Sequence, residues 1–236
     1  MQRAAQSPDE NRLLAALSRP SYQRLAEYLE PVSLTFGQIL YEPGDRIQHV
    51  YFPYSGVISL LSVVDSCKAA EVAVVGNEGV VGSSAALGIN ISHLRAVVQA
   101  SGTAARITAA RMRKEFDTHD SWKPELFHFT QALMDQIAQT AVCNRFHKVE
   151  ERLARWLLAI RDRVGSNRFH VTQEFLSLML GVRRVGVTAG ATAFQQRGLI
   201  AYSRGNIQLL NHAGLEAATC ECYRMVKKMY DRSYRK

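Results

Sequence analysis

The hydrophobic pattern of the chain changes twice along its length, and this change restricts the possible fold more than any single motif. Leucines recur at helix-like spacing over residues 9–30, with an interruption at Pro20. From Val32 to about Ile107, short β-prone runs alternate with turn residues about every eight to twelve positions, which is typical of an antiparallel sandwich or small barrel. Helix-like spacing returns after Thr108. The chain is therefore predicted to be an α+β protein with a central β-domain.

Four segments are expected from this pattern. They are an N-terminal helical segment over 1–31, a β-barrel over 32–122, a long helix over 123–147 and a helical C-terminal domain with a hairpin over 148–236. The long helix carries a narrow apolar stripe at alternating three- and four-residue spacing, of the kind that pairs two helices. Packing of this helix on its own barrel is the alternative, and both can hold at once.

Charge is distributed unevenly along the sequence. Residues 1–144 contain 12 Lys and Arg against 14 Asp and Glu, whereas residues 145–236 contain 17 against 7, a net charge of +10. This asymmetry suggests that the C-terminal part has a polyanionic partner. A basic surface that serves only solubility is the alternative.

The C-terminal domain contains a helix-turn-helix pattern. Thr172 is placed to cap a short helix, Gly181 to supply a sharp turn, and Val187 to anchor a second helix from below. Gly198 is expected to end that second helix. Two β-prone runs around the turn residues 203–206 then predict a hairpin, so the unit is interpreted as a winged helix-turn-helix.

In such a unit the first residues of the second helix enter the major groove of DNA. The planar arginine side chain suits guanine or phosphate, and the helix N-terminus at Thr172 favours a phosphate. Arg204, at the hairpin tip, could reach the DNA backbone or the minor groove. The residues expected to contact double-stranded DNA are Thr172, Gln173, Arg183, Arg184, Val185, Thr188 and Arg204. The alternative is that the two adjacent arginines are merely solvated charges.

Two stretches resemble the Crp/Fnr family of transcription regulators. They are "FGQILYEPGDRIQHVYFPYSGVISL" and "VTQEFLSLMLGVRRVGVTAGATAFQQRGLI". The resemblance implies a cyclic-nucleotide-binding-like β jelly roll, a long dimerisation helix and a C-terminal winged helix-turn-helix. It also implies a sequence-specific DNA-binding regulator that binds a palindromic site as a homodimer, with RNA polymerase as a further partner.

The chain departs from the nucleotide-binding members of this family in the effector pocket. Ser83 stands where those members carry an acid, Arg95-Ala96 keeps the arginine but loses the hydroxyl, and Ile137-Ala138 replaces a Thr-Ser pair. The corresponding pocket residues are Gly82, Ser83, Ser84, Arg95, Ala96 and Ile137. We therefore expect that the sensor domain does not bind cyclic AMP in the usual way, and leave open whether it folds without ligand or binds another one.

The effector and any cofactor stay unknown from the sequence. An iron–sulfur cluster of the N-terminal-cysteine type is excluded, because no cysteine precedes Cys67. Haem is a less favoured alternative, suggested by His128 and His147 on the long helix and by the i,i+4 spacing of Cys143 and His147. No residue is assigned as a metal ligand. Cys220-Glu-Cys222 is given a structural role, since neighbouring positions of a helix point apart.

The DNA-reading helix also departs from the best-known members, because Val185 replaces a glutamate and Ala189 an arginine. The usual half-site preference therefore does not transfer. No nucleophile–base pair, phosphate loop or metal-ligand cluster in the sequence suggests an enzyme. No apolar run approaches the roughly 20 residues of a membrane span, so a cytoplasmic protein without a membrane partner is expected. The alternative function is a small-molecule or redox sensor that acts mainly through protein contacts and binds DNA weakly.

Overall fold

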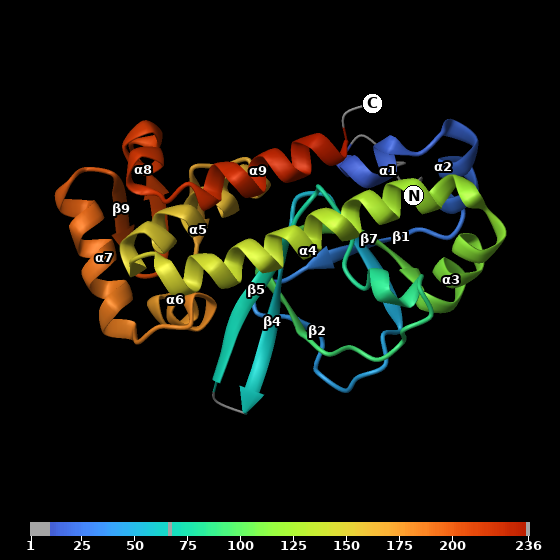
Figure 1. Ribbon diagram of the computed structural model, residues 1–236, viewed down its shortest axis with the longest axis horizontal. Coiled ribbons are helices and arrows are strands. Elements are labelled where there is room, and N and C mark those ends of the chain that lie inside the picture. Colours follow the sequence, from blue (N-terminus) through green and yellow to red (C-terminus); the bar gives the residue numbers. More distant parts are fainter. Residues whose placement is uncertain (1–9, 66–67, 235–236) are drawn as a thin grey trace.

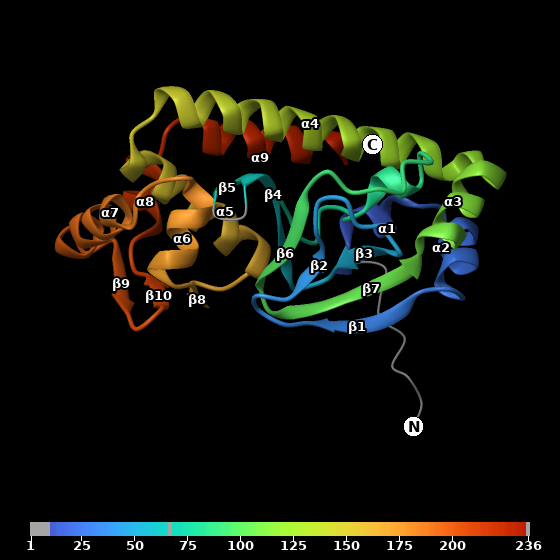
Figure 2. The ribbon, with the colours of Figure 1, turned by 90° about the horizontal axis from the view of Figure 1, so that it is seen from below.

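The computed structural model describes residues 10–65 and 68–234. Residues 1–9 of the expected N-terminal segment, together with Cys67, lie outside this part of the chain. The predicted α+β fold is confirmed: an antiparallel β-domain is followed by a long helix and by a C-terminal winged helix-turn-helix (Figures 1 and 2). None of the helices in the described ranges is both long and apolar enough to cross a membrane.

Two short helices precede the β-domain, α1 (Arg12–Ala16) and α2 (Arg19–Ala26). Pro20 lies in the first turn of α2, where its missing N–H costs no hydrogen bond. The buried Asn11 caps α1 by accepting a hydrogen bond from the Leu14 N–H at 3.1 Å. Its amide also donates to the carbonyl oxygens of Pro53 and Gly79, both at 2.9 Å, and so fastens α1 to the β-domain.

Two antiparallel sheets form the barrel. One sheet has the order β1 (Glu30–Leu34), β7 (Gly102–Thr108), β3 (His49–Pro53). The other has the order β2 (Ile39–Tyr41), β6 (Arg95–Ala100), β4 (Val57–Asp65), β5 (Lys68–Val75). A short 3-10 turn, η2 (Ser83–Ala85), lies in the connection from β5 to β6. All strand pairs are antiparallel, as the alternation of short runs predicts.

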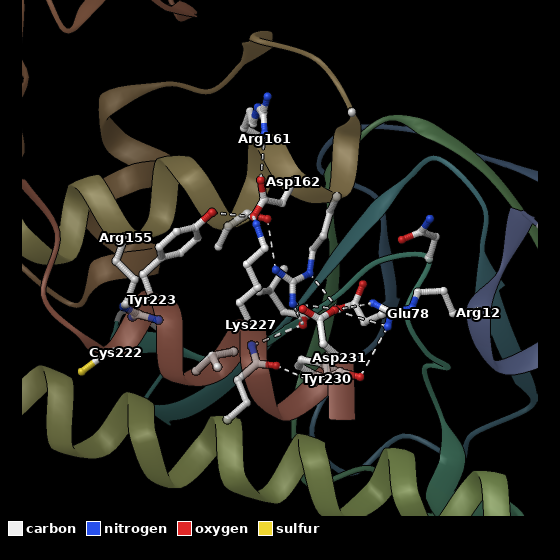
Figure 3. A pocket seen from close by; sticks show the side chains of 17 residues that line it. Arg12, Glu78, Arg155, Arg161, Asp162, Cys222, Tyr223, Lys227, Tyr230 and Asp231 are labelled. Atoms are coloured by element: carbon white, nitrogen blue, oxygen red, sulfur yellow. Dashed lines mark hydrogen bonds and ion pairs between the residues drawn. The ribbon is translucent and has the colours of Figure 1, made fainter. Parts of the chain in front are cut away.

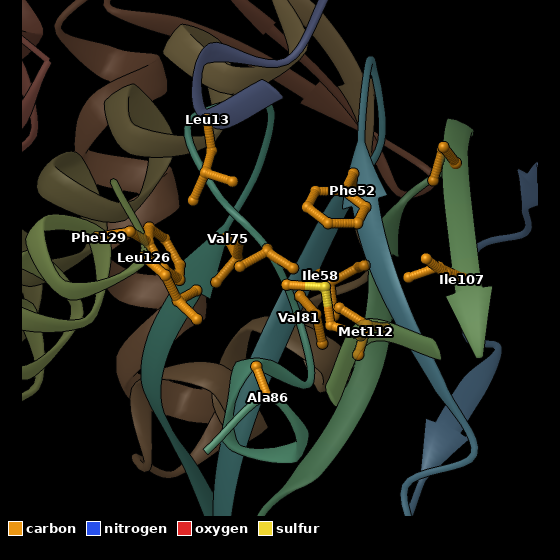
Figure 4. Close-up of a cluster of buried hydrophobic side chains, with 14 of the residues drawn as sticks. Leu13, Phe52, Ile58, Val75, Val81, Ala86, Ile107, Met112, Leu126 and Phe129 are labelled. Carbon is orange, nitrogen blue, oxygen red and sulfur yellow. The ribbon is translucent and has the colours of Figure 1, made fainter. Parts of the chain in front are cut away.

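The barrel core is apolar and receives side chains from helices as well as strands. Phe52, Ile58 and Ile107 come from the strands, whereas Met112 comes from helix α3 (Ala109–Thr118) (Figure 4). Leu13 of α1 completes one side. Because all five side chains are buried, the N-terminal helix and α3 are integral to the barrel.

The long helix α4 (Lys123–Phe146) follows the 3-10 turn η3 (Asp120–Trp122) and lies along the barrel. It also runs antiparallel to α9 (Cys222–Ser233), and the two helices lie side by side in both views (Figures 1 and 2). Tyr230 of α9 donates a hydrogen bond from its hydroxyl to the Gln136 side-chain oxygen of α4 at 2.6 Å.

The apolar positions of α4 belong to two different faces. Leu126 and Phe129 are fully buried against the barrel core. Large apolar side chains on the opposite face, Phe127 and Met134, are 52 % and 59 % exposed. The alternative in which the helix packs on its own barrel therefore holds, and a second, exposed stripe remains.

The C-terminal domain continues from α4 after a break at His147. Its elements are α5 (Val149–Val164), β8 (Arg168–His170), α6 (Gln173–Leu180), α7 (Arg184–Gln196), β9 (Ile200–Ser203), β10 (Asn206–Leu209) and α8 (His212–Ala218), followed by α9. The wing is a three-stranded sheet in the order β8-β10-β9, so the predicted hairpin gains a strand. The core of this domain also includes Val57 and Leu61 from β4, which continues the packing into the outer face of the barrel.

Candidate nucleic-acid interface

The turn between α6 and α7 has the geometry that its residues predict. The Thr172 hydroxyl caps α6 by accepting a hydrogen bond from the Phe175 N–H at 3.1 Å. Gly181 has a φ of +61°, a left-handed conformation that favours glycine, and ends α6. Leu176 and Val187 are fully buried. Gly198 follows α7 with a φ of +65°, so each helix of the pair ends at a glycine.

The N-terminal end of α7 presents its side chains to solvent. Arg183 is the N-cap residue and Arg184 the first helical residue, and both are exposed. Val185 is 72 % exposed. Thr188 and Ala189, one turn further on, are exposed as well. This end of α7 is therefore a free, cationic surface in the described structure.

Two glycines inside α7, at positions where glycine lowers helix stability, have different surroundings. A Cβ atom added to Gly190 would lie 3.2 Å from the Leu153 Cδ2 atom of α5. One added to Gly186 would lie 3.7 Å from Val149, an ordinary contact distance. Gly190 therefore lets α7 pack closely on α5. This packing holds α7 in place while its N-terminal end stays exposed.

A hydrogen bond links the two helices on their exposed side. The Thr188 hydroxyl contacts the Gln173 side-chain oxygen at 2.9 Å and the Arg184 carbonyl oxygen at 3.0 Å. Two of the sequence-predicted DNA contacts thus touch each other directly. The pair holds the first turn of α6 against the second turn of α7, so both helix N-termini keep a fixed spacing.

Arg204 lies at the tip of the wing, in the turn between β9 and β10. Its φ is +49°, the one positive value among the non-glycine residues that the structure describes. The side chain is exposed. The wing lies at the same end of the molecule as α7 (Figure 2), so the predicted residues are distributed over the start of α6, the start of α7 and the wing.

The barrel touches this unit directly. The Phe36 ring lies 5.1 Å from the Phe175 ring of α6 and 5.7 Å from the His170 ring of β8, measured between centroids. A Cβ atom added to Gly181 would lie 3.2 Å from the Ala70 Cβ of β5. Ala70 and Gly181 also line a cavity of about 960 Å³ between the β4–β5 hairpin and α6. The helix-turn-helix is therefore in contact with the barrel, a contact that the sequence did not predict.

The residues of the expected effector pocket are only partly arranged around an open site. Gly82 has a φ of +89° at the start of η2, and Ser83 and Ser84 follow it, half-buried. The Arg95 Nε atom contacts Glu42 at 2.7 Å in an ion pair, so this guanidinium has a partner within the barrel. Ala96 is fully buried.

Ile137, the remaining residue of that expected pocket, packs partly buried against the barrel core. An aliphatic side chain at this place supplies no hydrogen bond to a ligand. At the positions named from the sequence, Ser83 supplies no carboxylate, and Ala96 and Ile137 supply no hydroxyl.

A different cavity of about 380 Å³ lies between the barrel, α5 and α9 (Figure 3). Its charged side chains largely pair with one another. Arg163 of α5 contacts Glu78 at 2.7 Å, and Asp162 accepts a hydrogen bond from Tyr223 at 2.7 Å and lies 3.3 Å from the Lys227 ammonium. The contacts of Asp162 fasten α9 to α5, and the contact of Arg163 fastens α5 to the barrel. They join residues far apart in sequence, so no local motif could reveal them.

Three cysteines and one histidine lie close together where α4 ends and α9 begins. Cys220 precedes α9, and Cys222 is its first residue, so the interpretation that both sit on one helix and point apart is wrong. Their sulfur atoms lie close to the Cys143 sulfur atom and to the His147 ring, at the end of α4.

The two histidines considered for haem are far apart, since His128 lies near the start of α4 and His147 directly follows its last residue. His128 and His147 are separated by 19 positions, which is about 28 Å along a helix. His128 is exposed at the barrel end, so the two rings cannot bind one haem iron within a single chain.

Comparisons with known proteins agree with this architecture. Residues 151–218 match the family model of the Crp-like helix-turn-helix domain. No curated protein sequence matches the chain.

Among solved structures, a protein from Eubacterium rectale described as a Crp/Fnr-family transcriptional regulator has 16 % identity and a TM-score of 0.69, with 89 % of this chain and 98 % of that chain covered. FixK2 from Bradyrhizobium japonicum has 14 % identity and a TM-score of 0.67, with coverage of 81 % and 98 %. The c-di-GMP-responsive global regulator CLP of Xanthomonas campestris has 16 % identity and a TM-score of 0.65, with coverage of 82 % and 100 %. At these identities the likeness concerns the fold.

Proposed function

We propose, from the premise that this chain is a Crp/Fnr-type regulator with a Crp-like helix-turn-helix domain at residues 151–218, that it reads a two-fold symmetric DNA site as a homodimer. The observation that carries the proposal is the exposed N-terminal end of α7. Arg183 and Arg184 are exposed to solvent. They lie at the part of a recognition helix that meets base edges in the major groove.

Three further features support DNA as the partner. The capped N-terminus of α6 at Thr172 offers backbone N–H groups to a phosphate. Arg204 extends from the wing at the same end of the molecule. The net charge of +10 over residues 145–236 favours a polyanion. RNA polymerase stays the expected protein partner of a regulator of this type.

The exposed stripe of α4 supports a second copy of the chain as the other partner. Phe127, Met134, Ala138 and Ala141 are exposed on one face, at intervals of seven, four and three residues. Such spacing places side chains along a helix seam, and a helix seam between two copies would give the two-fold symmetry that a palindromic site requires.

The barrel is proposed as a sensor domain that does not use cyclic AMP in the usual way. The turn at Ser83 lacks a carboxylate, Arg95 is paired with Glu42, and Ile137 is aliphatic. The direct packing of Phe36 on Phe175 gives a route by which a change in the barrel could alter the position of α6.

Single substitutions of the two arginines test the DNA-reading assignment. In Arg183→Ala or Arg184→Ala, loss of a base contact should cost about 1–3 kcal/mol and relax specificity at one base pair. Loss of a phosphate contact should instead weaken binding to all sequences alike. Fluorescence anisotropy with selected and scrambled duplexes distinguishes these outcomes.

The matched control is Arg19→Ala, which removes the same charge from exposed α2, at the opposite end of the molecule. It should leave DNA affinity nearly unchanged. If both variants in α7 bind DNA like the control, the assignment of α7 as the reading helix is wrong.

A further inference from the structure

Four potential metal-binding side chains meet where α4 ends and α9 begins. Cys143 lies in the last turn of α4, His147 directly follows that helix, Cys220 lies in the turn after α8, and Cys222 starts α9. One ligand atom from each residue lies within 4.8 Å of all the others. Three of the four are cysteines and are buried, so the group is not a chance cluster of surface side chains.

The distances within the cluster fit a tetrahedral ion. The sulfur atoms of Cys143 and Cys220 are 3.6 Å apart, and the Cys222 sulfur lies 3.5 Å from the His147 Nδ1 atom. With Zn–S bonds of about 2.3 Å and Zn–N bonds of about 2.0–2.1 Å, neighbouring ligands of tetrahedral zinc lie roughly 3.5–3.8 Å apart. Two edges of the required tetrahedron are therefore already formed.

The surroundings orient the ligands as they would in a metal site. The His147 Nε2 atom faces the Glu221 carboxylate at 3.4 Å, which leaves Nδ1 directed at the sulfur atoms. A carboxylate on the far nitrogen is the usual support of a metal-bound histidine. The Gln139 amide donates a hydrogen bond to the Cys222 sulfur at 3.1 Å.

The charge around the cluster suits a thiolate-rich site. A zinc ion with three thiolates and a neutral imidazole carries one net negative charge. Arg152 and Arg155 of α5 interact electrostatically with the cysteines of this cluster. Their positive charges offset the negative charge of a loaded site.

We propose that Cys143, His147, Cys220 and Cys222 form a structural zinc site of the Cys3His type. Soft sulfur ligands in a tetrahedral set with one imidazole select zinc over magnesium or calcium. The ion joins the end of α4 to the start of α9, directly beside the link from α4 to α5. It thereby fixes the orientation of the helix-turn-helix unit relative to the barrel. The site does not depend on DNA binding.

The full-length protein, produced with zinc in the medium and purified under reducing conditions, tests the proposal. Elemental analysis should give about one zinc per chain. After removal of zinc by a chelator, the melting temperature should fall, because an ion that binds only the folded state stabilises it. Addition of cobalt should then produce the absorption bands of a tetrahedral, thiolate-bound ion.

Variants assign the ligands. Cys143→Ser and Cys222→Ser should lose most of the zinc, whereas Cys67→Ser, at the one cysteine of the sequence outside the proposed site, should keep it. Glu221→Gln should retain the site but bind zinc about 10- to 100-fold more weakly. That intermediate effect separates a supporting residue from a ligand.

Measurements on the wild-type protein keep the proposal falsifiable if a ligand variant fails to fold. A reduced wild-type protein that takes up neither zinc nor cobalt would overturn it. So would an intact mass lower by two hydrogens in the reduced preparation, since the close pair Cys143 and Cys220 would then form a disulfide instead. Equal zinc content in wild type and Cys143→Ser would also rule out the assigned ligands.

Discussion

Glu71 places a carboxyl group inside the wall of the barrel. It lies on β5, is 8 % exposed, and accepts a hydrogen bond from the Ser59 hydroxyl at 2.7 Å. Burial raises the pKa of Glu71 to about 7, although Ser59 and the guanidinium groups of Arg155 and Arg163 act in the opposite direction. The two arginines belong to α5, so the carboxyl lies where the barrel meets the DNA-binding unit.

A raised pKa in the folded state makes stability depend on pH. Below about pH 4.5, Glu71 is protonated in both the folded and the unfolded chain, and its burial is tolerated. As the pH rises through about 7, the folded state must hold a buried carboxylate, and stability is lost. A shift of this size corresponds to about 3 kcal/mol of unfolding free energy.

Glu71→Gln should remove that dependence, because an amide stays neutral and can still accept the Ser59 hydrogen bond. Urea unfolding at pH 5 to 8 measures the effect. The wild type should lose more stability than the variant as the pH rises. Glu27→Gln, at an exposed carboxyl, is the control and should follow the wild type. Parallel curves for wild type and Glu71→Gln would refute the prediction.

Single residues with a local conformational requirement were predictable from the sequence. Gly181 needs its positive φ to end α6, and Val187 needs burial beneath the turn, so their spacing alone identified the helix pair. Cys143 and Cys220 show the opposite case. They are 77 positions apart, and only the packing of α9 along α4 brings them together.

At the scale of elements, α4 shows why spacing alone left two packing arrangements of the long helix open. The apolar residues of α4 lie on more than one face, so their spacing does not say which face packs on the barrel. The buried face contains Leu126 and Phe129, and the exposed face contains Phe127 and Met134. Strand β8 was missed for a related reason: its three residues, Arg168–His170, are too few to show a pattern.

Met134→Glu tests the proposal that two copies of the chain pair through the exposed face of α4. Met134 lies in the middle of the exposed stripe, where two copies would place two carboxylates against each other at a cost of several kcal/mol. Light scattering should show the wild type at twice the chain mass of 26.4 kDa and the variant at the mass of one chain.

The control for this change is His128→Glu, at an exposed position on another side of α4. It adds the same charge and should remain a dimer. If Met134→Glu also stays a dimer, the two copies meet through a different surface.

At the scale of the whole molecule, the order of the parts could be predicted, but their contacts could not. Periodicity predicted the sequence of barrel, long helix and winged unit because each depends on local spacing. The packing of Phe36 on Phe175 and of α9 on α4 joins distant segments, and no local pattern encodes such pairs. These contacts make the barrel and the winged helix-turn-helix one connected structure.

Binding of the wild-type protein to DNA, measured as a salt titration against a pool of random duplexes followed by sequencing of the bound fraction, tests the central claim most directly. The predicted result is binding at low salt that weakens linearly with the logarithm of salt concentration. The bound sequences should then contain two-fold symmetric half-sites about 10–10.5 base pairs apart or a multiple of that spacing. A folded dimer that binds no DNA at low salt would contradict the account and favour a sensor that acts through protein contacts.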